Sequence, residues 1–386
     1  MSYNLLDLFL YRCTMKRLNY LFVCFALVCM VACQSQKSEI GDGTVQIHWD
    51  NVSPGDFKIE NVEYIPLETT DNSLLGSVYK VLFRNNHFYV LDKRSGGVYV
   101  FDRKGNFLSS IVKPGEGPEE YIELMDMDVD KEGNVYIADN ARMVVKKYRF
   151  PEFTHVETFD IGMHYWEFSY LDESCFILKD VFGKEGMEMK LAHFDGKNHK
   201  VTPLLEKAFS SVNEIDVMKC SKFNFYRSGD QLYYYERFTP NIYSVSTKGE
   251  LTKVYEILSS NYIPRGELEG LQRAPMKFLK ERKYIKDVIG LFENQEYFIC
   301  TPFIAPSGVC MVVPKNDVSE VVKIDLSQKS EFLGASLVEG VVEGKFFSIM
   351  NTPNEIALKN DSRLKGIGEN SNPVLMLFTI KISHGD

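Results

Sequence analysis

The sequence predicts an all-β protein, a six-bladed β-propeller whose blades each hold four antiparallel strands. Short runs rich in β-branched and aromatic residues alternate with turns of Gly, Asn, Asp and Pro. A strand motif also recurs: Tyr-Val-Leu-Asp at 89–92 and Tyr-Ile-Ala-Asp at 136–139 lie 47 residues apart. The turn Lys-Gly recurs at 104–105 and 248–249, a separation of 144 residues, or three times 48. A repeat of about 40–50 residues with four strands is typical of a propeller blade, and neither a sandwich nor a barrel explains it.

The composition fits a large folded domain of the acidic kind. The 386 residues are 45% hydrophobic and 13% aromatic, which is enough apolar material for an extensive core. The chain carries 53 acidic and 44 basic residues, a net charge of -9. Nucleic-acid binding needs a basic surface, so we expect no nucleic-acid partner.

The first element is an export signal over residues 1–32. Met15-Lys16-Arg17 provides a basic start, and residues 21–32 form an apolar run that ends in Ala32. The run is shorter than the roughly 20 residues that a membrane-spanning helix needs. Because the signal is complete from Met15, we interpret Met15 as the true start and residues 1–14 as an extension.

The second element is a membrane anchor with a tether. The residues at 30–33 (Met-Val-Ala-Cys) resemble a bacterial lipobox, which implies that Cys33 is acylated after the signal is removed. Residues 33–56 would then be a lipidated N-terminus and tether, and the protein would lie in the cell envelope, anchored to the outer membrane. The alternative is ordinary cleavage after Ala32 that leaves Cys33 as a free thiol.

The third element is the propeller itself, residues 57–386. Residues 57–67 have no blade of their own, so we expect them to add a strand to the last blade and close the ring. A long insert at 258–287, between blades four and five, contains a predicted short helix at 275–282 that begins with Pro. Residues 352–372 read as a polar loop. The expected blades are 78–112, 124–160, 164–205, 221–257, 287–325 and 332–382.

The propeller region contains four cysteines, Cys175, Cys220, Cys300 and Cys310. They form no C-x-x-C pair and have no nearby pair of histidines, which argues against a zinc site. Cys300 and Cys310 flank a predicted hairpin loop. A disulfide across this loop and two buried free thiols both remain open.

A family resemblance covers residues 60–150. It is carried by Pro-Leu-Glu-Thr-Thr-Asp at 66–71, Tyr-Val-Leu-Asp at 89–92 and Gly-Glu-Gly-Pro-Glu-Glu-Tyr at 115–121. This region resembles the six-bladed β-propeller lipoproteins of Bacteroidetes, relatives of the NHL and TolB-like propellers. The resemblance implies a secreted, lipid-anchored propeller and supplies no catalytic residues. Residues 34–37 lack the acidic residues that often follow the cysteine in surface-exposed lipoproteins of that phylum, so the periplasmic and surface orientations both stay open.

One face of the predicted ring collects the candidate ligand residues. The loops after the second and fourth strands of each blade share this face, and the insert 258–287 is expected to cover the same mouth. Arginines there could hold an anionic or sugar ligand through forked hydrogen bonds, or be solvated charges. The glycines of residues 115–117 could cradle a phosphate or form a turn. Tyr121 could contact a ligand or wedge between blades one and two. The candidates are Arg94, Glu119, Glu120, Tyr121, Arg142 and Arg237.

These observations favour a binding module without catalysis, which takes a protein or carbohydrate ligand at one mouth of the channel. No nucleophile motif is present, and no cofactor is expected. One alternative is a calcium-dependent hydrolase or lactonase, whose metal would be held by acids such as Asp126, Asp128 and Asp130, which alternate along a strand. A second alternative is a glycan-binding component of polysaccharide uptake.

Overall fold

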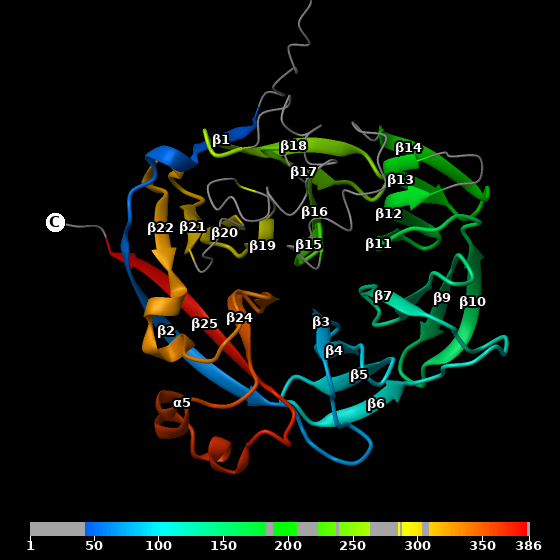
Figure 1. Ribbon diagram of the computed structural model, residues 1–386, viewed down its shortest axis with the longest axis horizontal. Coiled ribbons are helices and arrows are strands. Elements are labelled where there is room, and N and C mark those ends of the chain that lie inside the picture. The colour runs from blue at the N-terminus through cyan, green and yellow to red at the C-terminus, as the bar shows by residue number, and fades with distance from the viewer. Residues whose placement is uncertain are drawn as a thin grey trace, which may run out of the picture. The chain divides into compact units, whose positions relative to one another are not determined.

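Six antiparallel sheets follow one another around a ring, and each sheet is one blade (Figure 1). The structure is a computed structural model that describes residues 43–182, 188–206, 223–236, 239–262, 285, 288–302 and 309–383. Within each blade the chain runs from the innermost strand outwards, so β3, β7, β11, β15, β19 and β23 surround the centre. The predicted six-bladed propeller is therefore confirmed.

The strand bounds agree with the predicted blades. Blade one holds β3 (Val78–Arg84), β4 (His87–Asp92), β5 (Gly97–Asp102) and β6 (Phe107–Ile111); blade two holds β7 (Leu124–Val129), β8 (Val135–Asp139), β9 (Val144–Arg149) and β10 (Thr154–Asp160); blade three holds β11 (Glu167–Asp172), β12 (Cys175–Phe182), β13 (Glu188–Asp195) and β14 (Lys200–Glu206). Blade four holds β15 (Phe225–Ser228), β16 (Gln231–Tyr235), β17 (Asn241–Val245) and β18 (Leu251–Leu258); blade five holds β19 (Val288–Glu293), β20 (Tyr297–Pro302), β21 (Val309–Pro314) and β22 (Val322–Asp325).

The middle strands of a blade are covered on both faces by neighbouring blades, and their sequences show it. All residues of β8 are buried, and so are most residues of β4 and β5, which read as continuous apolar runs rather than as an alternation. The outermost strand β10 has several exposed side chains. The apolar clusters accordingly lie between blades: Tyr89 of blade one packs with Met127 of blade two, and Val90 of blade one with Phe347 of blade six.

The N-terminal segment closes the ring, as the sequence predicts. Strand β2 (Asp56–Pro66) pairs antiparallel with β25 (Val374–Ser383), the third strand of the last blade after β23 (Gly340–Val342) and β24 (Lys345–Met350). The first and last parts of the propeller are thus joined in one sheet. This pairing also covers an edge that would otherwise be open to another chain.

A further strand lies within the segment that the sequence analysis assigned to the tether. Strand β1 (Val45–His48) pairs in parallel with β18 at the outer edge of blade four, and a 3₁₀ turn, η1 (Trp49–Asn51), follows it. Ile47 and Trp49 are buried there. A four-residue strand whose partner is about 200 residues away has no local signal beyond the alternation of its side chains.

The described part of the chain contains one α-helix, and it lies in the last blade. Helix α5 (Glu355–Asn360) falls within 352–372, which was expected to be a polar loop. The Asn354 side chain accepts a hydrogen bond from the Ala357 amide and caps the helix, while Ala357 and Leu364 anchor the segment in the core. The helix predicted at 275–282 lies outside the described residues. No helix in the described ranges is long and apolar enough to cross a membrane.

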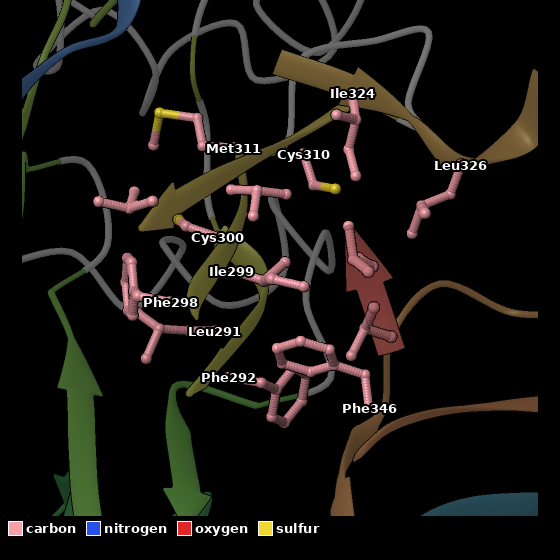
Figure 2. Close-up of a cluster of buried hydrophobic side chains, with 14 of the residues drawn as sticks. Leu291, Phe292, Phe298, Ile299, Cys300, Cys310, Met311, Ile324, Leu326 and Phe346 are labelled. Atoms are coloured by element: carbon pink, nitrogen blue, oxygen red, sulfur yellow. The ribbon is translucent and has the colours of Figure 1, made fainter. Parts of the chain in front are cut away.

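Cys300 and Cys310 are buried free thiols (Figure 2). In the register of β20 and β21, Cys300 is opposite Met311, whereas Cys310 is opposite Ile324 of β22. Side chains of successive residues point to opposite faces of a strand, so Cys310 faces away from Cys300. The hairpin thus decides between the two alternatives in favour of free thiols that fill apolar space.

Candidate functional site

The two mouths of the propeller channel are built from different loops. Strands alternate in direction within a blade, so the turns after first strands lie at one mouth and the turns after second strands at the other. The turns at residues 85–86, 131–134 and 229–230 belong to the first kind, and they follow β3, β7 and β15. We call this end the hairpin mouth. Arg94, Arg142 and the loop 115–121 lie at the opposite end of their strands.

A cavity of about 680 Å³ lies inside the ring and reaches the hairpin mouth. Its lining includes turn residues of blades one, two, four and six, among them Asn85, Lys131, Asp230 and Glu343. Deeper lining residues come from the innermost strands. This volume falls within the usual range of small-molecule pockets, about 300–1,000 Å³.

Arg84, at the end of β3, is the least compensated cation in the cavity wall. Its side chain is only 14% exposed, and among the described residues its hydrogen-bond partner is Asp230 Oδ1, at 3.3 Å from Nη1. The Asp230 side chain is 93% exposed, so this ion pair is well screened by solvent. Burial and the nearby Arg227 lower the pKa of Arg84, although Asp128 and Asp230 oppose them.

Arg227 of β15 also lines the cavity, but hydrogen bonds hold its Nη2 group in place. Its Nη2 donates to Asp128 Oδ2 at 3.1 Å, to Ser169 Oγ at 2.8 Å and to the Tyr170 carbonyl at 2.6 Å. Its Nε atom is buried without a hydrogen-bond partner among the described residues. Burial alone would raise the pKa of Asp128, but Arg227, Lys80 and the Ser169 hydroxyl outweigh it, so the pKa is lowered.

Lys80 joins blade one to blade two and to the residue that precedes blade four. Lys80 of β3 donates to Asp126 Oδ1 of β7 at 2.9 Å, and its Nζ lies 4.8 Å from the centre of the Phe223 ring, just before β15. Burial opposes the charge on Lys80, but Asp126, Asp128 and Glu167 outweigh it and raise the pKa of Lys80. The buried acids Asp126 and Asp128 therefore each have a basic partner within the protein, Lys80 and Arg227.

The wall from blades five and six is largely apolar, although Glu339 and Glu343 also belong to it. Blades five and six contribute side chains to it, and glycines keep the innermost strand close to the aromatic rings: a Cβ on Gly340 would lie 2.3 Å from a ring carbon of Phe347. Arginines from blades one and four thus face each other across the cavity, and the largely apolar wall from blades five and six lies between them in the ring. The apolar lining from blades five and six is Ile289, Phe292, Leu337, Val338, Val341 and Phe347.

The predicted glycine-rich loop folds onto its own acid. The Gly117 amide donates to Glu120 Oε2 at 2.8 Å, and a Cβ on Gly115 would lie 2.1 Å from the same oxygen. Glu120 thus occupies the position beside these glycines that a phosphate would take. Glu119 is exposed, and its carboxylate lies 3.6 Å from Lys113 Nζ.

Tyr121 and Arg142 join blades one and two. Tyr121 is 1% exposed, and its hydroxyl donates to the carbonyls of Gly96 and Ile111 at 2.7 and 3.0 Å. This position is the wedge that the sequence analysis offered as one of two alternatives. Arg142 donates to the carbonyls of Gly117, Glu120 and Glu116, the last at 2.5 Å, and so fixes the loop to blade two.

The remaining sequence candidates are dispersed. Arg94 is exposed, its stem covers Gly76, and its guanidinium has no hydrogen bond or ion pair with the described residues. Arg237 and the insert 263–284 lie outside the described residues. Asp130 accepts hydrogen bonds from its own turn, whereas Asp126 and Asp128 are paired with bases. Within the described ranges, no group of three His, Cys, Asp or Glu side chains is placed to hold a metal ion.

The sequence reasoning missed Lys80, Arg84 and Arg227. A signal for them was present, since charged residues at alternate positions of a propeller's innermost strand must face a channel or a neighbouring blade. The candidate ligand residues came from loops, and of the first strands only the acids at 126, 128 and 130 were considered.

The match to a family model covers residues 51–379, nearly the whole propeller. The chain belongs to the DUF4934 family. That family is described as a domain of unknown function, so membership adds no activity to the geometry. The search of curated proteins finds no match.

Two solved structures resemble this DUF4934 protein in fold. A putative exported protein from Bacteroides fragilis has 17% sequence identity and a TM-score of 0.66, over 88% of this chain and 99% of that chain. A member of the DUF4221 family from Bacteroides vulgatus has 12% identity and a TM-score of 0.53, over 86% of this chain and 100% of that chain. At these identities the likeness concerns the fold alone.

Proposed function

We propose that this DUF4934 propeller is a binding module of the cell envelope, anchored by lipid at Cys33, whose ligand enters the channel at the hairpin mouth. The observation that carries the proposal is the cavity of about 680 Å³ inside the ring. A pocket with an apolar wall and a few convergent polar groups is the usual form of a small-molecule site. The likeness to a putative exported protein and the predicted leader support a location outside the cytoplasm.

Binding is proposed without catalysis because the described residues of the cavity wall offer guanidinium and aromatic groups but no nucleophile next to a base. Of the three acids that line the cavity, Asp230 pairs with Arg84 and Glu343 with Arg103, while Glu339 is half-buried. The acids behind the wall are held by partners: Asp126 by Lys80, and Asp128 by Arg227 and Ser169. A rigid ring with a preformed cavity loses little entropy on binding a small ligand, which favours recognition.

The test uses the protein without its leader, residues 34–386, and two fluorescent probes with related ring systems. 1-Anilinonaphthalene-8-sulfonate is an anion, and N-phenyl-1-naphthylamine lacks the sulfonate. We expect saturable binding of at least one probe at one site per chain. Leu337→Trp should abolish it, because Leu337 lines the cavity and belongs to none of the buried clusters. Absence of saturable binding, or binding that survives in Leu337→Trp, would contradict the proposal.

The anchor is tested separately in a cell that processes lipoproteins. The wild-type chain should enter the membrane fraction and carry acyl chains on its N-terminal cysteine, as mass spectrometry would show. Cys33→Ser should remove both properties. Acylation is needed because each buried CH₂ adds about 0.8 kcal/mol of membrane affinity, and several chains together give stable attachment. A Cys33→Ser protein that stays in the membrane fraction would refute the anchor.

A further inference from the structure

The three basic residues Lys80, Arg227 and Arg84 differ in how well an acidic partner neutralises their charge. Lys80 is paired with Asp126 at 2.9 Å, and both side chains are at least 90% buried. Arg227 is paired with Asp128 at 3.1 Å. Among the described residues, Arg84 forms an ion pair with Asp230 alone, and Asp230 lies on the exposed rim just after β15. Two further carboxylates line the cavity: Glu343 is paired with Arg103, and Glu339 is half-buried. Of the two arginines in the wall, Arg84 is thus the one whose ion-pair partner is exposed to solvent.

The hydrogen-bonding capacity of the two arginines is not fully used by the described residues. Arg84 uses one of its five N–H groups on a described partner, and that contact is long at 3.3 Å. Arg227 makes its three hydrogen bonds with described residues through Nη2, and its buried Nε has no hydrogen-bond partner among them. Donors that lack acceptors in a partly dehydrated wall favour a ligand that brings acceptor oxygens and negative charge.

The apolar side of the cavity determines the rest of the ligand. Phe292 of β19 and Phe347 of β24 belong to this side but are only 7% and 1% exposed. The half-buried residues Ile289, Leu337 and Val341 present the accessible apolar surface. An inorganic anion would leave this surface in contact with water. A ligand with an apolar body would bury it at about 25 cal/mol per Å².

On the basis of the proposed function, we propose that the cavity binds an amphipathic organic anion, with a single carboxylate or sulfonate head on Arg84 and Arg227 and a compact apolar body against Ile289, Leu337 and Val341. The head would displace the exposed Asp230 carboxylate from Arg84. This exchange requires no change in the backbone, because Asp230 lies on the rim rather than in the wall. The specificity is for charge at one end and apolar surface at the other.

The same two probes test this inference against its matched neutral form. In the protein of residues 34–386, we expect the sulfonate probe to bind at least about tenfold more tightly than N-phenyl-1-naphthylamine. Arg84→Gln should remove this difference while the neutral probe binds within about twofold of wild type. Lys131→Gln is the control, since it removes one positive charge from the exposed rim of the same cavity. It should change neither affinity by more than about twofold, because exposed charges are screened.

A second variant works in the opposite direction and leaves the arginines intact. Asp230→Asn removes the competing carboxylate, so it should strengthen binding of the sulfonate probe several-fold and leave the neutral probe unchanged. Competition identifies the ligand class: 4-phenylbutyrate should displace the sulfonate probe at a concentration at least about tenfold lower than 4-phenyl-1-butanol. Inorganic sulfate at the concentration of the acid should displace little.

The outcomes separate the two proposals. Equal binding of the charged and neutral probes, or equal weakening of both by Arg84→Gln, would overturn the anion assignment and leave the binding cavity standing. Displacement by sulfate as effective as by 4-phenylbutyrate would overturn the apolar part. If neither probe binds the wild-type protein, the proposed function itself is refuted.

Discussion

Asp92 offers the sharpest test of how this propeller is held together. It ends β4 with a fully buried carboxylate that accepts four backbone N–H groups. Oδ2 accepts from Gly76 and from Ser77 (2.9 Å), where the chain enters the first strand of the blade, and Oδ1 accepts from Arg94 and Ser95 at 2.8 and 2.9 Å. The carboxylate therefore joins the inner strand to the turn that follows the second strand.

Asp92→Asn keeps the shape of the side chain but turns an NH₂ donor toward two of the four N–H donors. A hydrogen bond to a charged group contributes about 1.5–3 kcal/mol, and two are lost or weakened. We expect the free energy of unfolding to fall by about 3–5 kcal/mol. Asp139, in the corresponding position of blade two, accepts from two amides, Ile122 and Glu123, so Asp139→Asn should cost about half as much.

The assay is urea unfolding of residues 34–386, followed by circular dichroism, with the slope and midpoint fitted for each variant. Asp71→Asn is the control, because Asp71 is exposed in the turn that precedes the same blade and should change stability by less than about 0.5 kcal/mol. If Asp92→Asn is no more destabilising than Asp71→Asn, the four hydrogen bonds do not hold the blade. If Asp139→Asn exceeds Asp92→Asn, stability does not follow the number of amides bound.

Two further predictions concern buried titratable groups. Burial raises the pKa of Cys310 to about 12 and raises the pKa of Cys300 well above its usual range, so neither thiol should react with a thiol reagent in the native protein at pH 8. Cys300→Ser and Cys310→Ser should each lower the number of reactive thiols only after denaturation. A lower number of reactive thiols in either native variant would contradict this. The lowered pKa of Asp128 stabilises the folded state above its ordinary unfolded value of about 3.9, and this contribution is lost as the pH falls through the folded pKa. The difference in melting temperature between wild type and Asp128→Asn should therefore be constant from pH 7 to about 5 and shrink below about pH 4, whereas a difference that persists to pH 2 would contradict the assignment.

The repeat could be recognised in the sequence because its residues make the same contacts in two blades. Tyr-x-x-Asp at 89–92 and 136–139 places an apolar strand between two neighbouring blades and then an Asp that binds amides of the incoming inner strand. Because both blades make the same contacts, the motif recurs at the blade period. The period in turn predicts the ring and its closure by β2.

Other parts of the fold depend on contacts with no local signal. Strand β1 is defined by its partner β18, and the apolar pair Ile47 and Trp49 could as well belong to a tether. Helix α5 has only six residues, and its burial through Ala357 and the cap from Asn354 distinguish it from a loop. The cavity is still less visible, because Arg84 and Phe347 lie more than 260 residues apart and meet only when the ring closes.

The loop that is most recognisable in the sequence is one of the most tightly held in the structure. In residues 115–121, Glu120 accepts a hydrogen bond from the Gly117 amide, and Tyr121 is buried between blades. Arg142 donates hydrogen bonds to the carbonyls of this loop. A group whose hydrogen bonds are all made within the protein has little left with which to attract a ligand. The arginines of the channel are the opposite case, since Arg84 is buried with donors unused. In this propeller, therefore, the repeated and distinctive motifs stabilise the ring, and the proposed ligand site rests on an inner-strand arginine whose ion-pair partner is exposed.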